Sequence, residues 1–170
     1  MRKFDFQNDV LPLKDKLFRL ALRITLSREE AEDIVQETMI KVWNKRESWN
    51  EIESMEAFCM TICRNMAIDK TRKVNNDTES IDDKTVSQET DGISPEEKTI
   101  ISDRVSIVRT LINELPEKQK TAMQLRDFEG KSYKEIADIM NVSEDQVKIS
   151  IFRARQAIKK RFLDTENYGL

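Results

Sequence analysis

A basic segment near the end of the chain carries the side chains best suited to binding a ligand. Residues 147–162 contain no acidic side chain, whereas lysine and arginine recur throughout them. At 100° per residue, Ile149 and Phe152 point away from the apolar stripe that begins at Val147. Cations bind phosphates, and side chains between them can contact base edges and thymine methyl groups. The segment therefore predicts a nucleic-acid-binding helix, with an ordinary solvated basic helix as the alternative. The candidate contacts are Lys148, Ile149, Phe152, Arg153, Arg155, Lys159 and Lys160.

The residue types that most enzyme sites require are absent or poorly spaced. The chain has no histidine, which excludes a His-based catalytic triad and a His-containing metal site. Cys59 and Cys63 lie four residues apart on one predicted helix, and two thiols are too few for a structural zinc site. Buried apolar positions suit them better than the alternative, a redox pair. We expect no enzyme activity, no metal and no cofactor.

A helix, a tight turn and a second helix are predicted to position the basic segment. Ser132 and Glu135 have the spacing of a capping box, and Ser143 and Gln146 repeat it. Asn141 lies between the two boxes, and asparagine tolerates the left-handed conformation that a tight helix end requires. Two capped helix starts around such a turn predict a helix-turn-helix.

The composition favours an all-α protein with two small helical domains. Of 170 residues, 36% are charged, and only three are glycine and three proline, which leaves few turns for a sheet protein. Residues 74–98 hold eight acidic and two basic side chains, so the net charge of −3 comes from this segment. Such a composition does not bury enough apolar area to offset its ordering entropy. We predict a helical domain at 1–73, a flexible acidic linker at 74–93 and a helix-turn-helix domain at 94–170.

The N-terminal domain is predicted to contain three helices, at about residues 10–26, 28–45 and 55–73. On the second helix, alanine, valine and threonine form an apolar stripe at helical spacing, starting at Ala31. An exposed isoleucine, Ile40, lies on the opposite face among acids and an amide. That face is a candidate docking surface for another protein, although its composition alone also fits an ordinary solvated face.

Six short motifs resemble those of bacterial RNA polymerase sigma factors, and they occur in the family's order. The resemblance covers nearly the whole chain outside the predicted linker. Only the two core domains are present, as in the extracytoplasmic-function (ECF) group of the sigma-seventy family. The motifs are AEDIVQET followed by KVW (31–43), ICRNMAID (62–69), LPEKQ (115–119), LRDFEG (125–130), SYKEIA (132–137) and FRAR (152–155).

The resemblance implies roles for three sets of residues. The basic segment would read the minus-thirty-five promoter element. A second set would bind the clamp helices of the largest core-polymerase subunit: Asp33, Gln36, Glu37 and Ile40. A third set would capture a flipped base of the opened minus-ten element and contact its upstream part: Trp49, Asn50, Glu51, Ile52, Ser54, Arg64, Asn65, Arg72 and Lys73.

The resemblance also implies partners, namely core RNA polymerase (clamp helices and flap), promoter DNA and an anti-sigma factor. A free-standing regulator that binds duplex DNA and senses a signal through residues 1–73 is the competing hypothesis. Residues 31–43 discriminate between the two, because a sensor domain does not need a polymerase-docking helix. No stretch is apolar enough to span a membrane and no signal peptide is recognisable, so we expect a cytoplasmic protein without membrane insertion.

Overall fold

The computed structural model describes residues 3–77 and 101–167, and every regular element in these two ranges is helical. This confirms the predicted all-α class. The N-terminal helices are α1 (Lys14–Thr25), α2 (Arg28–Asn44) and α3 (Met55–Asp77). The C-terminal helices are α4 (Ile101–Glu114), α5 (Glu117–Met123), α6 (Tyr133–Met140) and α7 (Glu144–Asn167). Short π or 3-10 segments, η1 to η4, span Phe6–Val10, Leu11–Leu13, Arg46–Glu51 and Gln124–Phe128.

The N-terminal helices pack against one another through their apolar stripes. On α1, Leu17 and Leu20 are fully buried, and Leu26 ends the helix in the left-handed conformation, with φ at 57°. The Ser27 hydroxyl then accepts a hydrogen bond from the Glu30 amide at 3.3 Å and starts α2. Helix α3 runs through Asp77, four residues beyond the predicted end of the domain. The rest of the predicted linker, 78–93, lies outside the described residues.

The predicted helix-turn-helix is present, and both of its capping boxes are formed. Ser132 and Glu135 exchange two hydrogen bonds of 3.1 Å. Ser143 and Gln146 do the same, at 3.1 and 3.2 Å. Asn141 has the left-handed conformation expected of it, with φ at 55°. Local sequence signals therefore determine where α6 ends and where α7 begins.

Two helical segments change from one helix type to another along their length. The first was expected from residue 10, but the chain forms the π and 3-10 segments η1 and η2 before α1 begins at Lys14. Pro12 lies in η2, just before α1 begins, where the absence of a backbone N–H costs little stability. In the C-terminal group, α5 gives way to the π segment η4 after Met123, and Gly130 follows in the left-handed region, with φ at 67°.

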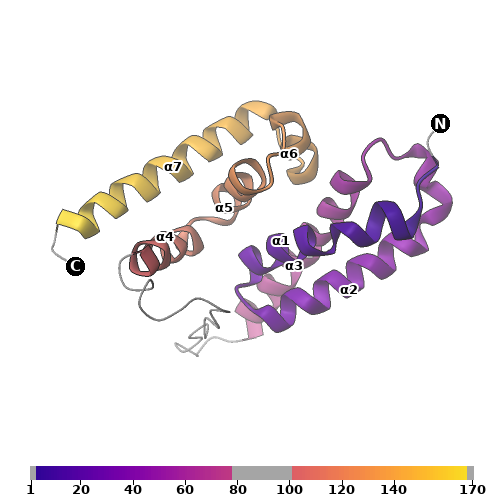
Figure 1. Ribbon diagram of the computed structural model, residues 1–170, viewed down its shortest axis with the longest axis horizontal. Coiled ribbons are helices and arrows are strands. Elements are labelled where there is room, and N and C mark those ends of the chain that lie inside the picture. Colours follow the sequence, from indigo (N-terminus) through magenta and orange to yellow (C-terminus); the bar gives the residue numbers. More distant parts are fainter. Residues whose placement is uncertain (1–2, 78–100, 168–170) are drawn as a thin grey trace.

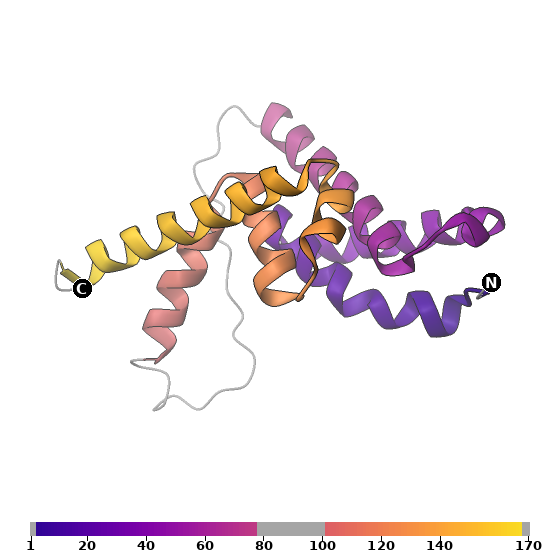
Figure 2. The same cartoon turned by 90° about the horizontal axis from the view of Figure 1, so that it is seen from above.

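The two groups of helices share a core, which the sequence did not predict. One cluster of buried side chains includes Leu17 and Ile34 of the N-terminal group and Leu125 and Ile136 of the C-terminal group. Helix α6 packs on α3, and α5 packs on α1. Figures 1 and 2 both show α5 and α6 against the N-terminal helices, with α7 running away from them toward the C-terminus. We call this arrangement the closed state.

Candidate nucleic-acid and protein interfaces

The outer face of α7 exposes the apolar side chains that the sequence assigned to it. Phe152 is 64% exposed and Ile149 is 48% exposed, whereas Val147 and Ile151 on the opposite face are buried. Arg153 is exposed beside Phe152. The core of the domain therefore does not account for Ile149 and Phe152, which are free to contact a partner. Lys159 and Lys160 are exposed further along the helix.

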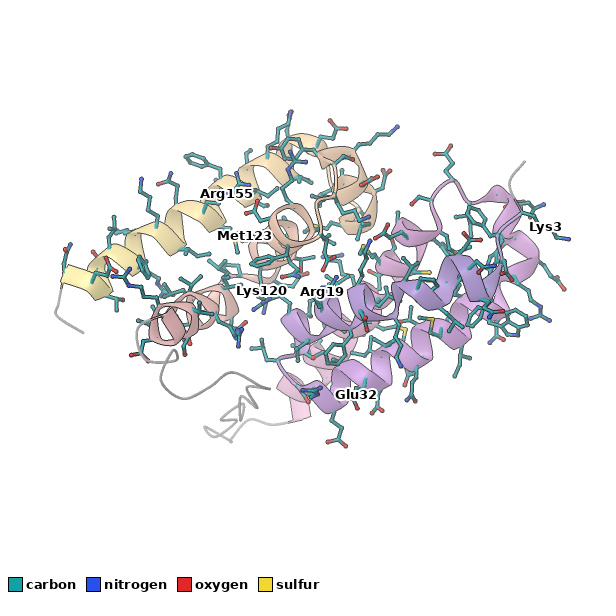
Figure 3. The ribbon with its side chains drawn as sticks, in the orientation of Figure 1. Lys3, Arg19, Glu32, Lys120, Met123 and Arg155 are labelled. Carbon is teal, nitrogen blue, oxygen red and sulfur yellow. The ribbon has the colours of Figure 1, made fainter. Side chains whose placement is uncertain are left out.

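Two of the predicted cations of α7 have contacts inside the C-terminal domain. Arg155 forms a two-pronged ion pair with Asp127 of η4, one prong being a 3.1 Å bond from Nε to Oδ2. The hydrogen bond to Asp127 raises the pKa of Arg155, although desolvation opposes the shift. Lys148 lies over the Tyr133 ring, with Nζ 5.5 Å from its centroid. The sequence grouped Arg155 with the other cations of α7 (Figure 3 labels it on this helix), but its ion pair with Asp127 holds α7 on η4.

The outward face of α2 is fully accessible. Asp33, Gln36, Glu37 and Ile40 are all exposed, and Ile40 reaches 59%. Among the described residues, the ion pair on this face joins Glu37 to Lys70 across 3.9 Å, which is a loose contact. An isoleucine this exposed contributes nothing to its own core, so the face is suited to a protein partner.

The structure buries Trp49, which the resemblance placed in the minus-ten set. Its side chain is only 7% exposed, and its Nε1 donates a hydrogen bond to the Val42 carbonyl oxygen at 3.0 Å. The ring also packs edge-on against Trp43, with centroids 6.2 Å apart. A buried indole has no face on which a base can stack, so Trp49 is a core residue that anchors the loop. From the sequence alone, an aromatic residue in a polar loop fits both a buried anchor and an exposed side chain that stacks on a base.

The rest of the predicted minus-ten loop is largely on the surface. Asn50 and Glu51 are exposed, and Ile52 is half-buried against the core. The exposed Ser54 caps α3, because its hydroxyl accepts a hydrogen bond from the Ala57 amide at 3.2 Å. The loop therefore presents a short polar surface, fixed at one end by Trp49 and at the other by Ser54.

On α3 the predicted minus-ten residues divide into two groups. Asn65, Arg72 and Lys73 are exposed. Arg64 is only 8% exposed, because its guanidinium binds both carboxylate oxygens of Glu117 at 3.2 Å. In the closed state Arg64, which the resemblance assigned to the minus-ten set, therefore lies in the domain interface.

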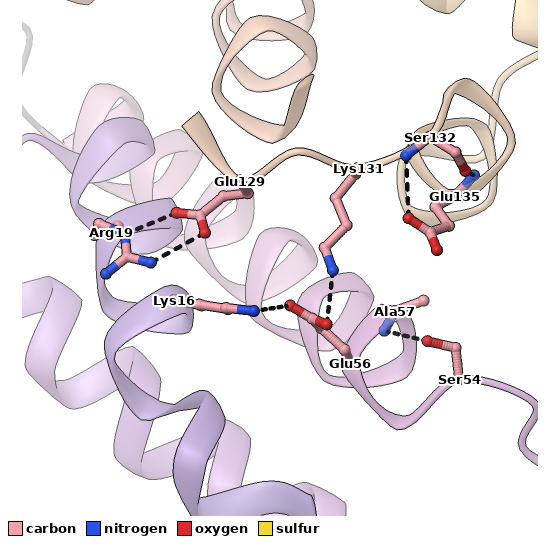
Figure 4. A network of polar contacts seen from close by, with 9 residues as sticks. All are labelled: Lys16, Arg19, Ser54, Glu56, Ala57, Glu129, Lys131, Ser132 and Glu135. Atoms are coloured by element: carbon pink, nitrogen blue, oxygen red, sulfur yellow. Dashed lines mark hydrogen bonds and ion pairs between the residues drawn. The ribbon is translucent and has the colours of Figure 1, made fainter. Parts of the chain in front are cut away.

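Further ion pairs cross the domain interface (Figure 4). Arg19 binds both oxygens of Glu129, at 2.7 and 3.0 Å. Glu56 lies between Lys131, at 2.6 Å, and Lys16, at 2.9 Å. Although burial opposes ionisation, the bonds to these two lysines hold the pKa of Glu56 below its usual value. With Arg64–Glu117, we call Arg19–Glu129 and Lys131–Glu56 the interdomain ion pairs.

The cations at this boundary are partly desolvated. Figure 3 shows Lys120 and Arg19 where the two groups of helices meet. Burial lowers the pKa of Lys120, and repulsion from Arg23 adds to the shift. Arg23 donates to the Asn113 side-chain oxygen at 2.8 Å, which also ties α1 to α4. These partners are 90 residues apart in the chain, so no local pattern in the sequence indicates them.

A groove of about 300 Å³ opens between α4, α7 and the end of α1. Its base is apolar and its edges carry arginines. Burial, together with repulsion from Arg109, lowers the pKa of Arg23 at this edge. The lining residues are Arg23, Arg104, Val105, Val108, Arg109, Ile112, Phe128 and Phe162.

Both cysteines are buried, as the sequence predicted. Burial raises the pKa of Cys59 and of Cys63 to about 12, so both thiols stay protonated at neutral pH. The Cys63 thiol donates to the Leu17 carbonyl oxygen at 3.4 Å. Among the described residues, no group of three or more Cys, Asp or Glu side chains could hold a metal ion, and no helix is long and apolar enough to cross a membrane.

Comparisons with known proteins match the two groups of helices separately. Residues 10–76 match the model of Sigma-70 region 2, and residues 106–158 match that of Sigma-70, region 4. The ECF RNA polymerase sigma-E factor of Haemophilus influenzae is 34% identical over 146 residues, which cover 80% of this chain and 76% of that protein. The chain belongs to the ECF RNA polymerase sigma factors. Promoter-specific initiation of transcription is the general role of this family, so the sigma-factor hypothesis is confirmed over that of a free-standing regulator.

Other similar proteins support the assignment over most of the chain. The ECF sigma factor SigW of Bacillus subtilis is 29% identical over 160 residues, covering 89% of this sigma factor and 85% of SigW. Among solved structures, the sigma factor RpoE of Bartonella quintana, in complex with the anti-sigma factor NepR, matches with a TM-score of 0.74 at 25% identity. The match covers 94% of this chain and 97% of RpoE, so it extends over both groups of helices.

Proposed function

We propose that this sigma factor binds core RNA polymerase through α2 and directs it to promoters through two separate DNA contacts. The outward face of α2 carries this proposal, because Ile40 is 59% exposed in the segment that most resembles the family. Asp33, Gln36 and Glu37 surround it with acceptors for cationic partners. The partner surface is then the clamp helices of the largest polymerase subunit, with the flap as a second contact for the C-terminal domain.

Helix α7 is the proposed reader of the minus-thirty-five element. A helix fits the major groove, where Arg153 can make a bidentate contact with guanine and Ile149 or Phe152 can contact a thymine methyl group. Lys159 and Lys160 lie further along the helix, where they would contact phosphates of the DNA backbone. Lys148 is close to the base-contacting side chains, whereas Arg155 acts by holding α7 on η4.

The 46–54 loop and the exposed side of α3 are the proposed minus-ten surface. Asn50, Glu51 and Ser54 offer hydrogen-bonding groups to a base that has left the stack. Arg72 and Lys73 on α3 are exposed cations for the backbone of the same strand. Trp49 keeps the loop in place from inside the core, and Ile52 supports it in part.

This assignment defines partners and location. The sigma factor works in the cytoplasm with core polymerase and promoter DNA, and it has no enzyme activity or cofactor of its own. An anti-sigma factor is a further partner, and the similarity to RpoE, a sigma factor solved in complex with NepR, supports that.

Run-off transcription tests the proposal. Purified protein is added to core polymerase on a pool of genomic fragments, and transcript starts are mapped. We expect discrete starts that share two upstream motifs, and none of these starts with core polymerase alone. If addition of the protein produces no new starts, the proposed function is wrong.

A further inference from the structure

The groove between α4, α7 and the end of α1 has an apolar floor that packing within the protein leaves partly uncovered. Val105 is 49% exposed and Phe128 is 55% exposed, and both line the groove. Val105, Val108 and Ile112 follow one another at spacings of three and four residues, so they lie on one face of α4. The volume of about 300 Å³ is at the lower end of the range of small-molecule sites.

A half-buried arginine at the edge of this floor has no acidic partner. Arg23 donates hydrogen bonds to the side-chain oxygens of Asn113, at 2.8 Å, and Gln124, at 3.3 Å, and both of these groups are neutral amides. Burial, followed by repulsion from Arg109, lowers the pKa of Arg23. The guanidinium is thus partly desolvated beside a second positive charge, and a bound anion would relieve both effects.

The other two arginines of the groove add to this excess of positive charge. Arg109 has no hydrogen bond or ion pair within the described ranges, and Arg104 has only a loose ion pair with Glu166, at 3.6 Å. Among the described residues that line the groove, none is acidic. Three arginines and one glutamate therefore leave two positive charges beside the apolar floor.

The two properties of the groove together select the chemistry of its ligand. A purely hydrophilic anion would pair with the arginines but leave Val105 and Phe128 in water. A neutral apolar molecule would cover these two side chains but leave Arg23 without a counter-charge. Only a ligand with an acidic group attached to an apolar body satisfies both parts of the groove.

We propose that this groove binds a small amphipathic organic anion, a carboxylate or sulfonate on an aromatic or short aliphatic body. The acidic group pairs with Arg23 and Arg109, and the body covers Val105 and Phe128. None of the lining residues belongs to the sets assigned to core polymerase, the minus-ten element or the minus-thirty-five element. The inference therefore goes beyond the proposed function and does not depend on it.

The probe that tests this site is 8-anilinonaphthalene-1-sulfonate, an aromatic anion whose fluorescence rises in apolar surroundings. Titration of the full chain should show saturable binding of one molecule per chain. Decanoate should displace the probe at a concentration at least tenfold lower than decylamine, which has the same chain length and the opposite charge. Absence of saturable binding, or equal displacement by the two, would overturn the proposal.

A carboxylate placed on the floor of the groove tests the location of the site. Val105→Glu should weaken probe binding at least tenfold, because the new side chain pairs with the arginines and removes apolar contact. Ser106→Glu is the matched control, since it adds the same charge at an exposed position of α4 about 100° around the helix and outside the groove. Circular dichroism should show equal helicity in both variants. Unchanged probe affinity in Val105→Glu would place the probe on another apolar surface, such as the outer face of α7, and would refute the site.

An exposed arginine tests the charge requirement with little effect on folding. Arg109→Gln should weaken the binding of decanoate about tenfold, as for the loss of one charge-assisted hydrogen bond. Lys118→Gln removes an exposed cation of α5 outside the groove and should leave the affinity unchanged. Equal affinity in both variants would refute the pairing with Arg109. Light scattering covers a second occupant: a dimer that the probe dissociates would assign the groove to another copy of the chain and overturn the proposal.

Discussion

The indole Nε1 of Trp49 donates a hydrogen bond to the carbonyl oxygen of Val42 across 3.0 Å, and this contact joins the 46–54 loop to the end of α2. The loop is therefore fixed from inside the N-terminal core. Replacing a residue with that role should lower the stability of the N-terminal domain, and it should change DNA binding only by displacing the loop.

Replacement of Trp49 separates these two roles. Trp49→Ala should lower the free energy of unfolding by about 3–5 kcal/mol, because it empties a large core site. Trp49→Phe keeps most of the volume and should lose about 1–2 kcal/mol with the hydrogen bond. Urea denaturation measures both. Unchanged stability together with altered minus-ten preference would restore the sequence-based assignment of Trp49 to DNA.

Substitutions on α2 test the docking face. Ile40→Glu and Asp33→Arg should weaken binding to core polymerase at least tenfold, because they remove an exposed apolar contact or reverse a charge, by about 1.4 kcal/mol or more. The melting temperature should hardly change, as is usual for surface positions. Arg28→Glu is the control, since it reverses a charge at an exposed position of the same helix, about 120° around the helix from Ile40. Equal affinity of all three variants would place the docking surface elsewhere.

Two sets of substitutions on α7 distinguish base reading from phosphate binding. Arg153→Ala in the polymerase complex should cost about 1–3 kcal/mol on the preferred promoter and much less on a scrambled one. Lys159→Ala combined with Lys160→Ala should weaken both alike and flatten the salt dependence, because fewer counterions are released. The measurement is a binding titration at several salt concentrations. If Arg153→Ala weakens both duplexes equally, Arg153 is a phosphate contact.

Glu56 should make stability depend on pH in the acid range. Its pKa is lower in the folded protein than in the unfolded chain, so its contribution is present above about pH 4.5 and is lost as the pH falls through the folded value. Glu56→Gln should therefore be less stable than the wild type at pH 7, and the difference should shrink as the pH falls below about 4.5. Thermal unfolding over a pH series checks this, and a constant difference would contradict it.

Local structure was predictable where one short segment contains the whole signal. The capping residues Ser132 and Ser143 and the left-handed Asn141 all act within one helical turn, and the structure has each of them as expected. The outward positions of Ile40 and Phe152 follow from helical spacing in the same way.

Contacts between distant segments were not predictable from the single sequence. Arg64 and Glu117 are 53 residues apart, and each belongs to a helix whose local pattern is satisfied without the other. Arg64 therefore looked like one more surface cation, and only the packing of α5 and α6 on the N-terminal helices buries it. The burial of Trp49 was missed for a related reason, since it depends on Trp43 and Val42 of the preceding helix.

The groove beside α4 makes closure sensitive to mass action. Its Arg23 edge comes from the N-terminal domain and the rest of its lining from the C-terminal domain, so the complete groove exists only in the closed state. A molecule bound there would add RT ln(1 + [L]/Kd) to the free energy of opening, about 2.7 kcal/mol at a hundredfold excess over Kd. The open population would fall about a hundredfold at that concentration. A molecule bound in this groove would thus strengthen the contact between the two groups of helices without touching α2 or the outer face of α7.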